Sequence, residues 1–179
     1  AAARPGSLNY STSGNGSPVH IAAAMFGDAA KVEIVHVPYR GGAMANTAVM
    51  SGDAQFTFAT LPAAMPLVKA GKLDALAVTT RTRVQQLSEV PTMAENGMFA
   101  DYEINTWNAL LAPAGTPDDV IRTLNAAVVK VMNSPKLQAS FRQEGAEPTS
   151  SSPGELKAFI DKQILYWNKV IKKLNLQIS

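Results

Sequence analysis

The stretch Leu8 to His20 reads Leu-Asn-Tyr-Ser-Thr-Ser-Gly-Asn-Gly-Ser-Pro-Val-His, and it predicts a strand, a glycine turn and the start of a helix. Gly14 and Gly16 tolerate the positive φ angles of a sharp reversal. Ser17 is a good N-cap, and Pro18 suits the first helical position because no backbone N–H is needed there. The free N–H groups of such a helix start, with nearby hydroxyls, favour an anion such as a carboxylate. A plain βα turn that binds nothing is the alternative.

A strand–turn–helix pattern recurs from this stretch to about residue 80. Alternating and β-branched stretches predict strands over residues 8–11, 31–37, 54–60 and 73–79. Helices are predicted between them, over residues 19–30, 43–50 and 61–69. Such repeated units with short turns predict an α/β fold, in which helices cover both faces of a parallel sheet.

Polar residues follow each predicted strand. In a sheet of this kind, ligands lie beyond the carboxyl ends of the strands. Here those ends carry hydroxyls, a tyrosine and two arginines, within Ser11–Ser13, Pro38–Arg40, Ala59–Thr60 and Thr79–Arg81. Helix N-termini and arginine side chains both favour oxyanions, so this convergence predicts a site for a small anionic ligand.

The carboxyl-terminal part predicts helices after one long extended segment, Tyr102–Ala112. Thr116-Pro117 is a strong helix start, with threonine as N-cap and proline in the first turn, and a further helix is expected over residues 135–144. Ser152–Glu155 is a capping box before a last helix with a broad apolar face. The first hundred residues already use two helix layers on their own sheet. We therefore expect the chain to lack the element that covers this apolar face.

The composition narrows the function. The chain has 179 residues, of which 46% are hydrophobic and 17% charged, so it can form a packed core. A net charge of +2 without a long basic run argues against nucleic acid as a partner. The lack of cysteine excludes disulfides, thiol catalysis and cysteine-based zinc sites. No apolar run is long enough to span a bilayer, and the first residues lack the apolar centre of a signal peptide.

Serine–histidine catalysis is the main enzymatic alternative, and His20 and His36 are the two histidines of the chain. There is no Gly-x-Ser-x-Gly nucleophile elbow, and Ser17 is engaged as a helix cap. His36 lies in a predicted strand and is expected to be a buried, bonded core histidine. Two separated histidines without paired acids form no metal site, and the glycine turn lacks the third glycine or the lysine of a nucleotide-binding loop. We expect no catalytic residue, no metal and no cofactor.

Several motifs occur in a fixed order along the chain. They are Leu8–Ser17 with His20, Val35–Gly42 (Val-His-Val-Pro-Tyr-Arg-Gly-Gly), Gly71–Thr79 (Gly-Lys-Leu-Asp-Ala-Leu-Ala-Val-Thr), Val90–Thr92 (Val-Pro-Thr) and Leu111–Pro117 (Leu-Ala-Pro-Ala-Gly-Thr-Pro). Together they resemble the Bug family, the periplasmic substrate-binding proteins of tripartite tricarboxylate transporters. The resemblance covers essentially the whole chain.

The resemblance implies a fold like that of type II periplasmic binding proteins, with the ligand between two lobes that crossover segments join. On this mapping, residues 1–105 are most of the second lobe without its first strand and helix, and residues 106–179 are the carboxyl-terminal part of an incomplete first lobe. Family members are much longer, so the chain is expected to be a fragment, a proteolysed product or the product of a truncated gene. Many relatives carry Asp-Asn in place of Ala59-Thr60, so the resemblance does not specify the substrate.

The implied function is capture of a small carboxylate or related metabolite in the periplasm for the membrane subunits of a transporter. The residues expected to bind the ligand are Ser13, Gly16, Ser17, His20, Tyr39, Arg40, Gly41, Gly42 and Thr60. The first four would hold a carboxylate through the helix cap and dipole, the next four would line the cleft, and the last would close one side. The alternatives are a periplasmic sensor or interaction protein, and a hydrolase that uses Ser17 and His20. Uncovered apolar surface also predicts self-association with another copy.

Overall fold

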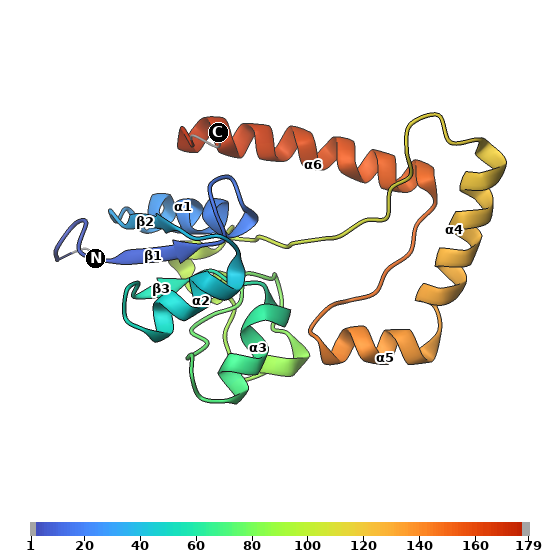
Figure 1. The fold of residues 1–179 in the computed structure, drawn as a ribbon. Coiled ribbons are helices and arrows are strands. Elements are labelled where there is room, and N and C mark those ends of the chain that lie inside the picture. The colour runs from blue at the N-terminus through green and yellow to red at the C-terminus, as the bar shows by residue number, and fades with distance from the viewer. Residues whose placement is uncertain (1–2, 177–179) are drawn as a thin grey trace. The chain divides into compact units, whose positions relative to one another are not determined.

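The computed structural model describes residues 3–176, which form two compact units. The first contains the residues up to Thr106 and those from Ile171 onward, and the second contains Trp107–Val170. The first is an α/β unit and the second is a helical unit (Figure 1).

A three-stranded parallel sheet, in the order β2-β1-β3, forms the centre of the α/β unit (Figure 1). Its strands are β1 (Asn9–Thr12), β2 (Val35–Pro38) and β3 (Phe56–Thr57). Tyr10 of β1 lies in register with His36 of β2 and with Phe56 of β3, so these three rings share one face of the sheet. Ser11, the next residue of β1, points to the opposite face.

Helices cover both faces of this sheet. They are α1 (Pro18–Ala30), α2 (Gly42–Met50) and α3 (Leu61–Lys69). α1 lies over the face of the three rings, because its His20 stacks on His36. α2 lies over the other face, where the Ser11 hydroxyl donates to the carbonyl of Ala45 at 2.8 Å. The predicted α/β fold with a parallel sheet flanked by helices is confirmed.

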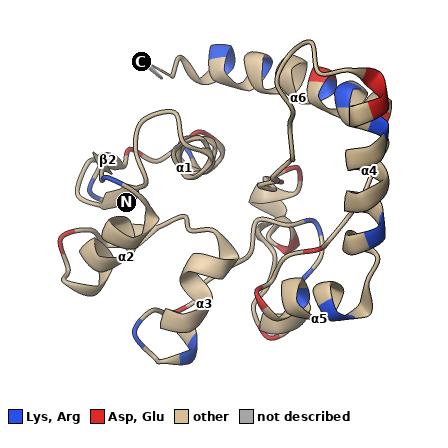
Figure 2. Cartoon of the chain, turned by 45° about the vertical axis from the view of Figure 1, so that its right-hand side comes forward, with Lys and Arg blue, Asp and Glu red and all other residues tan. Residues whose placement is uncertain are grey.

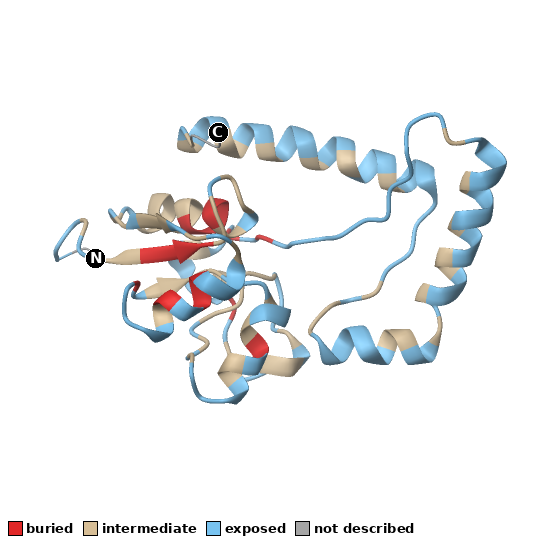
Figure 3. Ribbon diagram, in the orientation of Figure 1, coloured by how far each residue is buried: buried red, intermediate tan, exposed pale blue. Residues whose placement is uncertain are grey.

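The core of the α/β unit is small and aromatic. Phe26 of α1 packs against Phe58 and Phe99, and Tyr102 packs against the same two rings. The Tyr102 hydroxyl donates to the carbonyl of Ala22 at 2.7 Å. This bond ties α1 to the segment that follows three 3-10 helices, η1 (Gln85–Leu87), η2 (Met93–Glu95) and η3 (Gly97–Phe99). Figure 3 shows buried residues in β1, α1, α2 and α3.

Residues 73–79 form no strand, so the prediction of a fourth strand is wrong. Val78 makes a single parallel bridge with Thr92. Ile104 donates its backbone N–H to the carbonyl of Thr79 at 3.0 Å, and the Thr79 hydroxyl donates to the carbonyl of Ile104 at 2.8 Å. The segment therefore pairs with later parts of the chain rather than with the sheet, because β3 is only two residues long and gives it no edge to continue.

Other element boundaries also differ from the sequence prediction. The strand expected over residues 54–60 is limited to Phe56–Thr57. The strand expected from residue 31 begins at Val35, because Lys31 takes a left-handed conformation (φ 51°) and closes α1. The N-cap before the first helix of the helical unit is Pro117 rather than Thr116. The Thr116 hydroxyl instead donates to the carbonyl of Pro113 at 2.8 Å.

The helical unit contains the predicted helices α4 (Asp118–Met132) and α5 (Pro135–Gln143) and most of α6 (Pro153–Leu174). The capping box before α6 is confirmed. The Ser152 backbone N–H donates to the Glu155 carboxylate at 2.8 Å, and the Glu155 N–H donates to the Ser152 hydroxyl at 3.3 Å. No described residue of α4, α5 or α6 is fully buried, so the predicted apolar face of α6 is only partly covered in this structure (Figure 3).

Acidic and basic residues are interspersed along the helices of the helical unit (Figure 2). Lys157 and Asp161, one turn apart in α6, form an ion pair at 2.7 Å. Within residues 3–176, no helix combines the length and the apolar character that a membrane crossing requires.

Candidate ligand-binding site

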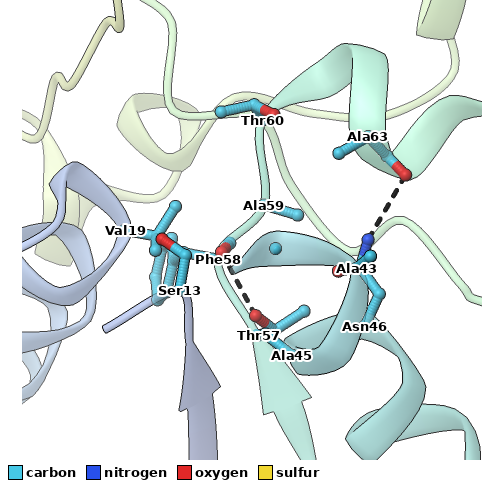
Figure 4. Close-up of a pocket in the computed structure, with 11 residues that line it drawn as sticks. Ser13, Val19, Ala43, Ala45, Asn46, Thr57, Phe58, Ala59, Thr60 and Ala63 are labelled. Atoms are coloured by element: carbon cyan, nitrogen blue, oxygen red, sulfur yellow. Dashed lines mark hydrogen bonds between the residues drawn. The ribbon is translucent and has the colours of Figure 1, made fainter. Parts of the chain in front are cut away.

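Three strand ends and three helix starts meet at one edge of the sheet. β1 leads into α1, β2 into α2 and β3 into α3, so each helix begins at the carboxyl end of a parallel strand. A cavity of about 270 Å³ lies at this edge (Figure 4). Its apolar lining residues are Val19, Ala43, Ala45, Phe58, Ala59 and Ala63. The polar side chains in its lining belong to Ser13, Asn46, Thr57 and Thr60, and Gly42 completes it.

The glycine turn, residues 13–17, joins β1 to α1. Gly14 and Gly16 have φ angles of 127° and 69°, which glycine adopts without strain. Ser17 is the N-cap of α1, and its hydroxyl accepts from the backbone N–H of His20 at 3.3 Å. The same hydroxyl donates to the carbonyl of Gly14 at 2.7 Å, which closes the turn. Ser13 is the first residue of the turn and lines the cavity.

The second turn joins β2 to α2 and also depends on glycine. Gly41, with a φ of 99°, is the N-cap of α2 and makes no side-chain capping bond. The first N–H groups of α2, which begin at Gly42, have no partner inside the helix and remain available to a ligand. Tyr39 donates its backbone N–H to the carbonyl of Thr12 at 2.9 Å, which holds this turn beside the glycine turn. Arg40 is exposed and has no ion-pair partner among the described residues.

The third turn brings β3 into α3. Thr60 is the N-cap of α3, and its side chain makes no capping bond, so its hydroxyl is available at the cavity (Figure 4). Asn46, on the first turns of α2, is only 2% exposed. Its amide nitrogen donates to the carbonyl of Ala63 at 3.3 Å, which ties α2 to α3 (Figure 4). Its Oδ1 is buried and has no hydrogen-bond partner among the described residues.

The electrostatics of the cavity favour an anion. None of its lining residues is charged, so the local field comes from the positive N-terminal ends of the surrounding helices. Free N–H groups and hydroxyls at its rim suit carboxylate oxygens. The alanine, valine and phenylalanine side chains suit a hydrocarbon chain. The arrangement can therefore bind a carboxylate that carries a short apolar body.

The cavity brings together three of the residues that the sequence predicts as ligand-binding, Ser13, Gly42 and Thr60. The other six, Gly16, Ser17, His20, Tyr39, Arg40 and Gly41, lie outside its lining. Their roles in binding stay predictions. Sequence reasoning missed Asn46, although it lies four residues after Gly42 and therefore on the same helix face. An asparagine among the small apolar residues of this helix was the available signal.

The two histidines stack on each other rather than pointing into the cavity. Their ring centroids are 4.0 Å apart with an angle of 10° between the planes. Burial lowers the pKa of His20, and burial together with the neighbouring His20 lowers the pKa of His36 to about 4. His20 is 6% exposed, and its Nδ1 accepts from the Gly16 N–H at 3.1 Å. The Ser17 hydroxyl is thus bonded to the backbone and not to an imidazole, unlike a nucleophile and its general base.

Residues 1–176 match the family described as "Tripartite tricarboxylate transporter family receptor". The UPF0065 protein in the tcbD-tcbE intergenic region of Pseudomonas sp. (strain P51) is 32% identical over 175 residues, which make up 98% of this chain and 52% of that protein. The structure of R. palustris Rpa4515 with adipate superimposes with a TM-score of 0.93 at 36% identity, over 98% of this chain and 58% of that one. The periplasmic binding protein BugD superimposes with a TM-score of 0.86 at 27% identity, over 98% of this chain and 59% of its own.

These similarities extend over nearly the whole of this chain, while the chain spans about half the length of the Pseudomonas sp. (strain P51) relative and of BugT from Bordetella pertussis. The similarity in structure includes both the strand–turn–helix units and the later helices, since it covers 98% of the residues. The chain therefore belongs to the tripartite tricarboxylate transporter receptor family, as the resemblance to the Bug proteins predicted.

Proposed function

We propose that this protein captures a small carboxylate in the periplasm and delivers it to the membrane subunits of a tripartite tricarboxylate transporter. The observation that carries the proposal is the cavity at the sheet edge, where three helices begin and no lining residue is charged. Membership of the receptor family supports the transport role. Catalysis, a bound cofactor and nucleic acid have no part in this proposal.

The substrate class that we propose is a small dicarboxylate with an unsubstituted hydrocarbon chain. Adipate, bound by the relative from R. palustris, is a compound of this kind. The six apolar side chains of the cavity can pack on methylene groups, while Ser13 and Thr60 supply hydroxyls for a carboxylate. Ala59 offers no charge to an ammonium group, which disfavours amino acids.

We also propose that residues 1–105 are the lobe that carries this site and that residues 106–179 belong to the other lobe of a two-lobed receptor. The division of the chain between Thr106 and Trp107 supports this boundary, although the residues from Ile171 onward group with the first unit. In such a receptor, the second wall of the ligand cleft comes from the other lobe.

Isothermal titration calorimetry with adipate tests the proposal on the protein expressed from its native gene. We expect binding, and we expect Ala59→Asp to weaken it by about tenfold or more, because a carboxylate in the cavity repels the ligand. Ala114→Asp, which places the same charge at an exposed site in the helical unit, is the matched control and should leave affinity unchanged. Failure of the unchanged protein to bind any of a panel of small mono- and dicarboxylates contradicts the proposal. Equal affinity after both Gly16→Val and Ser17→Ala contradicts the predicted role of the glycine turn.

Uptake measurements separate a transport receptor from a sensor. Deletion of the gene should abolish uptake of the bound carboxylate by the source cells, and the unchanged gene should restore it. Uptake that is normal in the deletion strain, together with binding by the purified protein, would support a sensor in place of a transport receptor.

A further inference from the structure

His20 and His36, the two histidines of the chain, form a stacked pair beneath the glycine turn. His20 comes from α1 and His36 from β2, so the pair joins two elements that follow different turns of the site. Neither ring lines the cavity. The pair therefore affects a ligand only through the backbone that it supports.

One glycine amide of the turn is bonded to this pair directly, and the other is linked to it through Thr12. The Gly16 N–H donates directly to Nδ1 of His20 at 3.1 Å. The Gly14 N–H donates to the hydroxyl oxygen of Thr12 at 3.3 Å, and that oxygen lies 2.6 Å from Nε2 of His36. The imidazoles thus hold the turn at two points, once directly and once through Thr12.

The bond to His20 depends on the protonation state of that ring. Nδ1 of His20 accepts a hydrogen bond only while it carries no proton, and a proton there would face the Gly16 N–H donor. Protonation of both rings would place two positive charges in stacked rings with centroids 4.0 Å apart. The Gly16 bond therefore persists only while His20 is neutral, whereas the Thr12 hydroxyl can donate to or accept from Nε2 of His36.

The surroundings of the pair contain no charge that would stabilise a protonated ring. Tyr10 of β1 stacks on His36 at 5.0 Å and is the titratable group that faces the pair from the sheet. Burial raises the pKa of Tyr10 to about 12, so its hydroxyl stays neutral. Among the described residues, neither α1 nor the turns around the pair place an acidic or basic side chain that shifts the pKa of either imidazole, apart from the effect of His20 on His36.

We propose that His20 and His36 are positioning residues for the glycine turn, and that protonation of His20 breaks its bond to the Gly16 N–H and releases the turn from its ligand-binding conformation. The effect on the ligand rests on the proposed function, because it assumes that the turn contributes to carboxylate binding. The direction of the pH dependence follows from the pKa of each ring, which lies below its ordinary value of 6.5. Stability from the neutral pair is complete above pH 6.5 and is lost as the pH falls from 6.5 towards about 4.

A pH titration followed by NMR tests the link between the rings and the turn without any ligand. The imidazole signals and the backbone amide signals of Gly14 and Gly16 are recorded from pH 7.5 to about pH 3 in the unchanged protein, so that the range extends below the pKa of His36, about 4. We expect both amide signals to shift with the midpoints of the two rings, below pH 6.5. Amide signals that stay fixed while the rings titrate would overturn the proposal.

Paired substitutions at His20 test the effect on binding. His20→Phe keeps a ring but removes the acceptor, and we expect about tenfold weaker adipate binding at pH 7, the loss of one hydrogen bond. His20→Asn places an amide oxygen near the position of Nδ1, so it should recover most of that affinity and lose the His20 part of the pH dependence. The protonation of adipate itself is common to all variants and cancels in this comparison.

The outcomes are separable from those of the proposed function. A purely structural role predicts the same pH profile for the Asn variant as for the unchanged protein, and that result would overturn the proposal. If His20→Asn does not fold, the corresponding variant His36→Gln, which keeps an acceptor or donor near Nε2, takes its place. If the unchanged protein binds no carboxylate, the proposed function fails, and the amide titration alone decides whether the pair controls the turn.

Discussion

The α/β unit and the helical unit differ in how far their apolar side chains are buried. In the α/β unit, Ile21, Met65 and Tyr102 are each at most 9% exposed. In the helical unit, α6 carries an apolar face of similar chemistry, yet Ile164 is 54% and Leu165 is 64% exposed. Amphipathic spacing is sufficient to specify a helix, whereas burial depends on the surface that the helix meets.

The two units are therefore held together by different interactions. The α/β unit has a buried aromatic cluster and a sheet that two layers of helices cover. The helical unit has mostly local interactions, such as the capping box of Ser152 and Glu155 and the ion pair of Lys157 and Asp161. Local interactions of this kind contribute about 1 kcal/mol or less each, so the helical unit is expected to gain stability from any surface that covers it.

The largest difference between the units should appear on removal of an isoleucine side chain. Ile21→Ala is expected to lower the free energy of unfolding by about 2–4 kcal/mol, because it leaves a cavity in the core. Ile164→Ala, the same change on the exposed face of α6, should cost less than about 1 kcal/mol. Urea denaturation of both variants measures the two losses. A loss of equal size would mean that α6 is covered in solution and would break the comparison.

The exposed apolar residues of α6 should also determine self-association. We expect concentration-dependent association of this chain, and we expect Leu165→Glu to raise its dissociation constant about tenfold, since a charge on an apolar contact surface opposes pairing. Leu76→Glu is the matched change at a leucine of the α/β unit that is 76% exposed, and it should have no effect. Sedimentation velocity over a range of concentrations distinguishes the two. A monomer at high concentration for the unchanged chain contradicts this expectation.

The parts of the fold that sequence predicts well are those that local chemistry determines. Gly14 and Gly16 adopt positive φ, and Ser17 caps α1, because these preferences belong to the residues themselves. The strand predicted over residues 73–79 is absent because a strand also needs a neighbouring edge, which the sequence of the segment does not contain. The same limit applies to α6, because its residue pattern predicts an apolar face but not the surface that packs against that face.

The candidate site shows the same division. Ser13, Gly42 and Thr60 were accessible from sequence because each lies where a strand or helix of a parallel sheet begins or ends. Asn46 was missed because its role depends on the carbonyl of Ala63, in another helix. The stacking of the two histidines was missed for the same reason, since it depends on how α1 packs against β2.

Removal of one tyrosine hydroxyl in each unit should change the free energy of unfolding by a smaller amount. Tyr102→Phe removes the hydrogen bond from the buried hydroxyl to the carbonyl of Ala22, so we expect a loss of about 1 kcal/mol in the free energy of unfolding. Tyr166→Phe, on a tyrosine of α6 that is 46% exposed, should change it by less than about 0.5 kcal/mol. Thermal or urea unfolding of both variants gives the comparison. Equal effects would indicate that Tyr166 has a buried partner in solution.

The smallest effect concerns two glutamates that occupy the same position in a capping box, one in each unit. Glu95 accepts from the Thr92 N–H and also pairs with Arg83 at 2.8 Å, and these contacts, the arginine first, lower its pKa to about 2. Bonds from the backbone and hydroxyl of Ser152 lower the pKa of Glu155, and no arginine contributes to this shift. The stability that each carboxylate supplies is present above its ordinary pKa of 4.5 and is lost as the pH falls through its lowered value. Glu95 should therefore hold its cap down to about pH 2.

In an NMR titration, Arg83→Gln should raise the pKa of Glu95 and leave that of Glu155 unchanged. A Glu95 pKa that does not move would show that the capping bonds, rather than the arginine, set it.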